Sequence, residues 1–278
     1  ACGTLFYPDR RGQITGSGLL TLRNTGTNTL GDETRRLSLD NAGNTYTGGT
    51  VLQGNGTSGR LNVWTHTTGS FGTGPITLLE NAEVRFQDAA ASAGNLSISV
   101  LANTNVNGSN SGVQFQGGAQ GGTATINTNG EGSYVLFGGG ANAQQATLNN
   151  NGGRVIFQET SSGGSATIHN NGGVVQLSNT TDLSGATVLN NNTGLTAQVY
   201  INGMAVGTPA RVGSLSGSGN VVLGDATLEI GARGLNDTIS GVIASTGPGL
   251  FDSQGGIYIN PLLGAGNVRS LNMNRAGI

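Results

Sequence analysis

Apolar residues recur at a fixed interval in the middle of the chain. Four blocks of the form Ala-Thr-aliphatic begin at positions 124, 146, 166 and 186. An apolar pair precedes each block and always ends at the same distance before its alanine. A short repeated unit indicates a stacked array, in which each unit buries its apolar face against its neighbours. The four pairs are Val113/Phe115, Val135/Phe137, Val155/Phe157 and Val175/Leu177.

Each unit predicts two short β-strands. Val155 and Phe157 lie on one face and Arg154 on the other, because alternate side chains of a strand point to opposite faces. Residues 166–168 form a second strand. The segment 169–173 (His-Asn-Asn-Gly-Gly) indicates a turn, since Asn and Gly tolerate positive φ. No segment combines helical apolar spacing with capping signals.

Strands of this length, recurring about every 20 residues, predict an all-β chain folded as a parallel β-helix. Each coil would pair with the coils above and below at about 4.8 Å. The whole chain would then form roughly thirteen to fourteen coils, in a rod about 60–65 Å long. A two-sheet sandwich or an up-and-down barrel is the alternative, but antiparallel hairpins do not require so strict a phase.

The same phase predicts side-chain ladders along the rod. An asparagine follows the alanine of each block at a constant offset, and we expect these amides to hydrogen-bond from coil to coil at one corner. The asparagines are Asn129, Asn151, Asn171 and Asn191. A second, apolar ladder is expected to fill the interior with Val135, Phe137, Val155, Phe157, Val175 and Leu177.

Composition changes this picture little. Hydrophobic residues make up 35% of the 278 residues and fall at regular positions, which argues against disorder despite 51 glycines. The net charge of −2 argues against a nucleic-acid partner, because phosphate binding needs clustered cations. All twelve basic residues are arginine, which excludes a P-loop lysine or a Schiff base.

Cys2 stands alone, so we expect a buried thiol rather than a disulfide or a lipid anchor. No stretch reaches the ~20 apolar residues of a membrane span.

The flanks of the repeat carry a more specific signal. The segment 44–50 (Asn-Thr-Tyr-Thr-Gly-Gly-Thr), with 16–22 before it and 72–78 after it, resembles the passenger-associated transport repeat of bacterial autotransporters. Residues 213–231 with 239–243 are similar to the segment that commonly precedes such a repeat. The resemblance implies a right-handed parallel β-helix that is exported and exposed outside a bacterium.

The chain also departs from that family. An insertion around residues 32–36 interrupts the first repeat, and residues 264–274 do not match the family pattern. No run of ten-residue amphipathic segments for the membrane domain of an autotransporter is seen in the sequence, so the resemblance is to the passenger region. We expect either a passenger fragment or a stand-alone protein that reuses the repeat. We expect one β-helix domain over residues 1–278. It would comprise an N-terminal segment (1–11), repeat-like coils (12–110), regular repeats (111–200), and C-terminal coils with an end segment (201–278).

Candidate chemistry is sparse. The segment 54–59 satisfies G-x-G-x-x-G but has no strand–helix context. His66 and His169 stand alone, without a second ligand at zinc spacing. The densest acidic stretch holds Glu80, Glu83 and Asp88.

The favoured interpretation of Glu83 is a surface ion pair with Arg85 of small energetic consequence. Asp182 is expected to be isolated in its coil. Trp64 and His66 form either a small exposed patch or, preferably, a contact beneath the inserted loop of the 30s. We therefore predict no enzyme activity, catalytic residue, cofactor or metal ligand.

Two roles fit a weakly charged rod. The first is a structural subunit, secreted or on the bacterial cell surface, that stacks head-to-tail into a fibre or layer. The second is a monomeric adhesin passenger that binds glycans or other cells. The end-to-end contacts of the first role would come from Leu5, Phe6, Tyr7, Ile257, Tyr258, Ile259, Leu271 and Met273.

Overall fold

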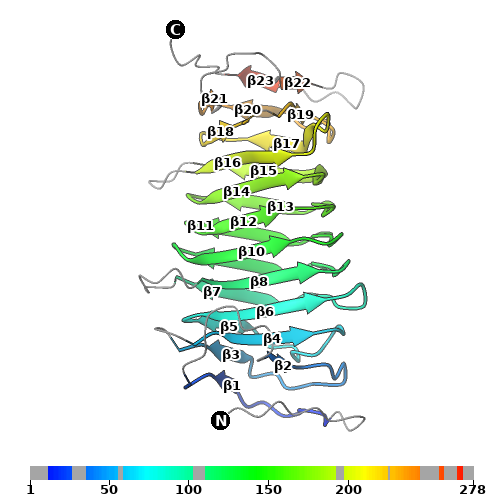
Figure 1. Ribbon diagram of the computed structural model, residues 1–278, viewed down its shortest axis with the longest axis vertical. Helices are drawn as coiled ribbons and strands as arrows, with labels where there is room; N and C mark the ends of the chain where they lie inside the picture. The colour runs from blue at the N-terminus through cyan, green and yellow to red at the C-terminus, as the bar shows by residue number, and fades with distance from the viewer. Residues whose placement is uncertain are drawn as a thin grey trace.

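The computed structural model describes residues 12–26, 36–55, 59–102, 110–191, 197–224 and 226–244, and the strands Ile257–Ile259 and Val268–Leu271. All regular secondary structure in these residues is β-strand. The strands stack into a rod, with β1 near one end and β22 near the other (Figure 1).

The first sheet runs along the described rod and consists of the odd-numbered strands from β1 to β19, followed by β22. Its eleven strands are, in spatial order, β1 (Leu20–Arg23), β3 (Thr50–Gln53), β5 (Ile76–Leu79), β7 (Ser97–Leu101), β9 (Thr125–Asn129), β11 (Thr147–Asn151), β13 (Thr167–Asn170), β15 (Asp182–Asn190), β17 (Ala210–Ser216), β19 (Leu228–Ile230) and β22 (Ile257–Ile259).

The second sheet faces the first and contains the even-numbered strands from β2 to β18, followed by β21. Its ten strands are β2 (Arg36–Ser38), β4 (Leu61–Thr65), β6 (Ala82–Gln87), β8 (Ser111–Gln116), β10 (Ser133–Phe137), β12 (Arg154–Phe157), β14 (Val174–Asn179), β16 (Gln198–Met204), β18 (Asn220–Val222) and β21 (Ile243–Ala244). A separate pair is formed by β20 (Asp237–Ile239) and β23 (Val268–Leu271).

The pairing confirms the predicted parallel β-helix. Neighbouring strands of both sheets pair in parallel, and Val135 lies in register with Val113 on one side and Val155 on the other. Phe137 lies in register with Phe115 and Phe157. Residues one repeat apart in sequence are therefore spatial neighbours, which rules out the antiparallel alternatives. The right-handed winding stays a prediction.

The predicted number of coils is wrong. Within the described residues the first sheet contains eleven strands, and ten steps of about 4.8 Å between them give a rod of about 48 Å. Insertions outside the central repeat lengthen the coils. Leu20 pairs with Thr50 and Ile98 with Ile126, so these coils are longer than the one that joins Val135 to Val155. The regular spacing holds only in the middle of the rod.

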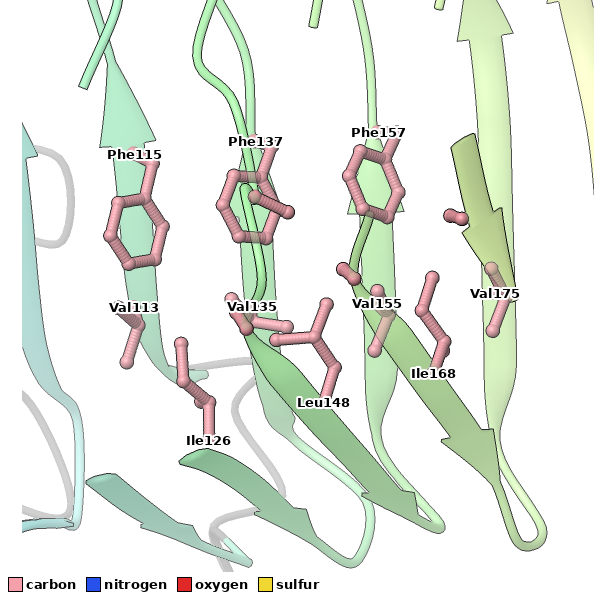
Figure 2. Packing of buried hydrophobic residues seen from close by; sticks show 14 of the residues in the cluster. Val113, Phe115, Ile126, Val135, Phe137, Leu148, Val155, Phe157, Ile168 and Val175 are labelled. Atoms are coloured by element: carbon pink, nitrogen blue, oxygen red, sulfur yellow. The ribbon is translucent and has the colours of Figure 1, made fainter. Parts of the chain in front are cut away.

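An aromatic stack runs through the interior. Phe86, Phe115, Phe137 and Phe157 lie one above the other, with ring centroids 4.9, 4.6 and 5.0 Å apart and interplanar angles of 5–9°. Valines of the second sheet face Ile126, Leu148 and Ile168 of the first sheet across the same core (Figure 2). Stacked aromatic pairs add about 0.5–1.5 kcal/mol each beyond their burial.

One corner explains part of the glycine content. The second residue after each interior Phe or Leu of the second sheet turns the chain with positive φ. Most L side chains disfavour this conformation. Gly117 and Gly139 occupy it in two coils, whereas Asp88, Glu159 and Asn179 occupy it in others, with φ of 77°, 58° and 61°.

Candidate functional site

The predicted asparagine column lies on the outer surface of the first sheet. Asn151 donates its side-chain amide to Asn129 Oδ1 at 3.2 Å, and Asn171 donates to Asn151 Oδ1 at 3.1 Å. At Asn191 the backbone N–H donates to the carbonyl of Asn170. These side chains are partly or fully exposed, so their hydrogen bonds compete with water.

A second ladder, which the sequence reasoning missed, lies inside the rod. Thr128 Oγ1 donates to Asn150 Oδ1, Asn150 Nδ2 donates to Asn170 Oδ1, and Asn170 Nδ2 donates to Asn190 Oδ1, each at 2.7 Å. Asn190 Nδ2 then donates to the Asn220 carbonyl at 2.9 Å. All four ladder side chains are at most 1% exposed.

The inner ladder continues an aliphatic column. In the earlier coils the same inward register holds Leu22, Leu52, Leu78 and Val100, and Val100 pairs with Thr128. The column therefore changes from aliphatic to a hydroxyl between β7 and β9, and to amides from β11 onward. The sequence signal was present, because Asn150 stands two residues after inward Leu148 and alternation places it inside. The inner ladder was not predicted, because polar residues are usually expected to point outward.

Glycines make room for the inner ladder. A Cβ on Gly173 would lie 2.4 Å from Asn150 Nδ2, and one on Gly219 would lie 2.7 Å from Asn190 Nδ2. Gly173 is the second glycine of the segment 170–173 (Asn-Asn-Gly-Gly). This position requires glycine, because any larger side chain would clash with the Asn150 amide of the preceding coil.

The predicted apolar column lies where the alternation placed it. All six of its side chains are 0% exposed and belong to one continuous core. These are Val135, Phe137, Val155, Phe157, Val175 and Leu177.

The expected ion pair between Glu83 and Arg85 forms, but its expected place on the surface is wrong. Glu83 is 1% exposed, although its side chain lies on the outer side of the second sheet. Arg60 Nη1 contacts its Oε2 at 3.1 Å and Arg85 Nη2 its Oε1 at 3.5 Å. Gln114 Nε2 donates to Oε2 at 2.9 Å, and the Tyr134 hydroxyl donates to the same oxygen. Burying an ion pair is costly unless such hydrogen bonds satisfy it.

Tyr134 covers this cluster because its neighbour is glycine. The ring lies over Gly112, where a Cβ would come within 2.2 Å of ring carbons. Burial, followed by the negative charge of Glu83, raises the pKa of the Tyr134 hydroxyl far above its ordinary value. The hydroxyl therefore acts as a hydrogen-bond donor to the carboxylate.

Trp64 is sandwiched between cations. The guanidinium carbons of Arg36 and Arg85 lie 4.2 and 4.5 Å from the ring centroid. They come from β2 and β6, the two strands that flank β4, so they approach from opposite sides. Both ring faces that a sugar could stack on are therefore occupied. The inserted loop predicted to cover Trp64 lies almost wholly outside the described residues.

The two histidines occupy different settings. His66 Nδ1 lies 3.1 Å from Asp40 Oδ1, and its Nε2 lies 4.0 Å from Asp88 Oδ2. His169 points outward from the first sheet, in register with Asn149. Among the described residues, no group of three or more His, Cys, Asp or Glu side chains is arranged to hold a metal ion. Asn55 and Gly59 of the glycine-rich motif form an antiparallel bridge, which is no phosphate-binding strand–helix turn.

Asp182 is not isolated, contrary to the expectation. It is the register partner of Arg211, whose Nε donates to Glu229 Oε2 at 2.8 Å. This hydrogen bond raises the pKa of the Arg211 guanidinium. The three residues stack on successive coils beside an open hollow of about 390 Å³, whose lining includes Val212 and Ile230.

The predicted end contacts are only partly described. Ile257, Tyr258 and Ile259 form β22, the last strand of the first sheet, and Leu271 ends β23. Cys2, Leu5, Phe6, Tyr7 and Met273 lie outside the described residues.

Comparison with family models, curated proteins and solved structures gives no match. None of the described segments is a helix long and apolar enough to cross a membrane.

Proposed function

We propose that the chain is a non-enzymatic structural protein, exported from a bacterium, whose subunits stack head-to-tail into a fibre or layer. The observation that carries this proposal is the parallel direction of the strands in both long sheets. Within the described residues, β1 and β2 begin the two sheets, and β22 and β21 end them. Each of these end strands therefore has a described neighbour on one side only.

Open strand edges favour pairing with another chain. In a parallel sheet the last strand has the direction that the first strand of the next subunit needs. Stacking β22 onto β1 of a second copy and β21 onto its β2 would continue both sheets. Such a contact joins different surfaces and does not close on itself, so it propagates as a filament.

The polar groups of the described surface also favour a structural role. Glu83 is held by two arginines, Arg211 by Glu229, and His66 by Asp40. Groups bound in this way stabilise neighbouring coils and are less free to act on a substrate. The aromatic stack and the inner ladder add stiffness, which suits a fibre subunit.

The adhesin role has one observation in its favour. The hollow beside Asp182, Arg211 and Glu229 presents two carboxylates and a guanidinium, which are groups that bind sugar hydroxyls. A glycan array probed with the wild-type protein and with Arg211→Ala separates this role from the structural one. Binding that disappears in the variant would favour the adhesin.

Assembly is tested by substituting the edge of β1 that has no neighbour among the described residues. The backbone N–H groups of Leu20 and Asn24 donate to β3, so those of the odd-numbered residues between them point to the open edge. Thr21→Pro removes one such donor and keeps the bonds to β3, since edge strands tolerate proline. Thr21→Val is the matched control, because it keeps the N–H.

Negative-stain microscopy and light scattering then give the answer. The wild type and Thr21→Val should form filaments, and Thr21→Pro should remain as single rods of about 48 Å, from eleven strands at ~4.8 Å spacing. Wild-type protein that stays as single rods at every concentration would refute the proposed function.

A further inference from the structure

The outer face of the first sheet carries no formal charge over most of its length. We define the charge-free face as the outward residues of β3, β5, β7, β9, β11 and β13, together with Thr187 and Leu189 of β15. These positions hold Ser, Thr, Asn, Gln and aliphatic residues, with His169 as the one titratable group. All of them are partly or fully exposed, and only at the β3 end do charged side chains of the described residues contact the face, where Gln53 is hydrogen-bonded to Arg23 and Glu80.

The opposite side of the rod is different. Outward residues of the second sheet include Arg36, Glu83, Arg85 and Arg154. A charge-free face can meet a copy of itself without like-charge repulsion, whereas a face with scattered arginines would bring like charges together. The charge distribution therefore allows the charge-free face, and not the second sheet, to meet a copy of itself without like-charge repulsion.

The side chains of the charge-free face are already ordered. Asn149 donates to Asn127 at 2.8 Å, and Asn151 donates to Asn129 at 3.2 Å in the outer ladder. An amide has two donor hydrogens and two acceptor lone pairs, so each linked asparagine keeps further capacity for a partner. Binding by groups that are already held in place costs less conformational entropy.

The spacing of this face selects its partner. Its side chains repeat at about 4.8 Å along the rod and about 6.6 Å along each strand, because alternate residues face outward. A ligand that matches many repeats at once must have the same period. A second copy of the same face has this period by construction.

The area of the face predicts how strong this contact is. Seven strands span about 29 Å and five residues about 16 Å, which gives roughly 460 Å² per subunit. A standard stable interface buries about 800 Å² per partner. One subunit pair is thus too weak to persist, but subunits joined in a fibre add their contacts as a multivalent array.

We propose that the charge-free face pairs fibres side by side, each fibre binding the same face of a second fibre. This inference rests on the proposed head-to-tail assembly, because isolated subunits would not form the lateral contact. Lateral pairing turns single filaments into ribbons or layers.

The test places like charges on the charge-free face without touching the ends. Thr77→Glu/Thr147→Glu adds two carboxylates, on β5 and β11, both at partly exposed outward positions. Gln87→Glu/Gln158→Glu is the matched control. It adds two carboxylates to the outer side of the second sheet, with the same separation of three coils. Circular dichroism melting checks that both variants fold.

Fibres are compared by negative-stain microscopy and by the fraction that pellets at low speed. Wild-type and control fibres should associate laterally, whereas the Thr77/Thr147 variant should form single fibres and pellet about tenfold less. Its lateral association should return at 1 M salt, where the Debye length falls to about 3 Å. A purely structural defect would not be rescued by salt.

Three outcomes would overturn the inference. Wild-type fibres that stay single would refute lateral pairing and leave head-to-tail assembly intact. Equal association of the two variants would show that another surface is used. Lateral dimers of isolated wild-type subunits at micromolar concentration would contradict the dependence on fibres. Absence of any fibre refutes the proposed function, and the inference falls with it.

Discussion

The inner amide ladder offers the sharpest test of the inside and outside assignment. Asn170 and Asn171 are adjacent in sequence, but Asn170 is 0% exposed and Asn171 lies on the outer surface. Replacing either one by alanine removes the same chemical group. The two substitutions should differ only through where the side chain lies.

The expected cost of Asn170→Ala follows from its contacts. The change removes hydrogen bonds to Asn150, Asn190 and the Gln198 carbonyl, and one from the Gly173 N–H. Asn150 Nδ2 keeps the Val174 carbonyl at 3.3 Å. Asn190 Oδ1 loses the donor that Asn170 supplied. Four lost hydrogen bonds at about 0.5–1 kcal/mol each and a buried orphan at about 1 kcal/mol give a total of about 3–5 kcal/mol.

Asn171→Ala is the matched control. It removes the exposed 3.1 Å bond to Asn151, and water replaces that partner. We expect a cost below about 1 kcal/mol. The difference of about 3 kcal/mol corresponds to roughly a hundredfold change in the local unfolding equilibrium, since about 1.4 kcal/mol is tenfold.

Denaturant titration followed by circular dichroism gives the overall loss, and hydrogen exchange of the β13 amides gives the local one. A second variant separates lost hydrogen bonds from a simple cavity. Thr128→Val/Asn150→Leu/Asn170→Leu/Asn190→Leu extends the aliphatic column of the earlier coils. It leaves no ladder side chain without its side-chain partner and opens no cavity, and only backbone groups such as the Gly173 N–H lose an amide, so it should cost less than Asn170→Ala alone. Equal losses for Asn170→Ala and Asn171→Ala would refute the assignment.

Three further predictions concern the core and the Glu83 cluster. Phe137→Ala should cost about 3–5 kcal/mol by denaturant titration, because it opens a cavity in the middle of the aromatic stack, and a loss below about 1 kcal/mol would contradict the stack. Gly112→Ala should displace Tyr134 and expose Glu83, seen as increased tyrosine quenching by acrylamide; unchanged quenching would show that the ring does not depend on this glycine. The pKa of Tyr134 is raised in the fold, so stability should be constant below the ordinary tyrosine value of 10.0 and fall above it, as the unfolded chain loses its proton first. Tyr134→Phe should weaken that alkaline loss, and an identical pH profile for both proteins would argue against the buried hydroxyl.

Sequence periodicity predicted the fold well where the repeat is regular. The fixed phase of Val135, Phe137, Val155 and Phe157 placed register partners correctly, because a parallel array forces equal spacing on residues that stack. The coil number was overestimated, since insertions between β1 and β3 and between β7 and β9 lengthen coils without leaving an apolar signal.

The side-chain clusters were harder to predict. Glu83 is buried by Arg60 and by Tyr134, which is 51 residues later in the chain. These residues lie in different coils of the rod. No pattern within a single repeat therefore connects them. The alternation of apolar and polar residues already placed the inner asparagines inside the rod. A buried polar column is stable only when each amide binds another, and predicting this requires knowing the register of several coils at once.

X-ray diffraction from an oriented fibre sample tests the central claim most directly. Strands stacked along the rod and across subunit ends predict a sharp reflection at about 4.8 Å on the meridian. The eleven strands of the first sheet in the described residues also predict an axial repeat of at least about 53 Å, from eleven steps of ~4.8 Å. A reflection at about 4.8 Å on the equator, or a protein that forms only separate rods and no oriented fibre, would contradict the account.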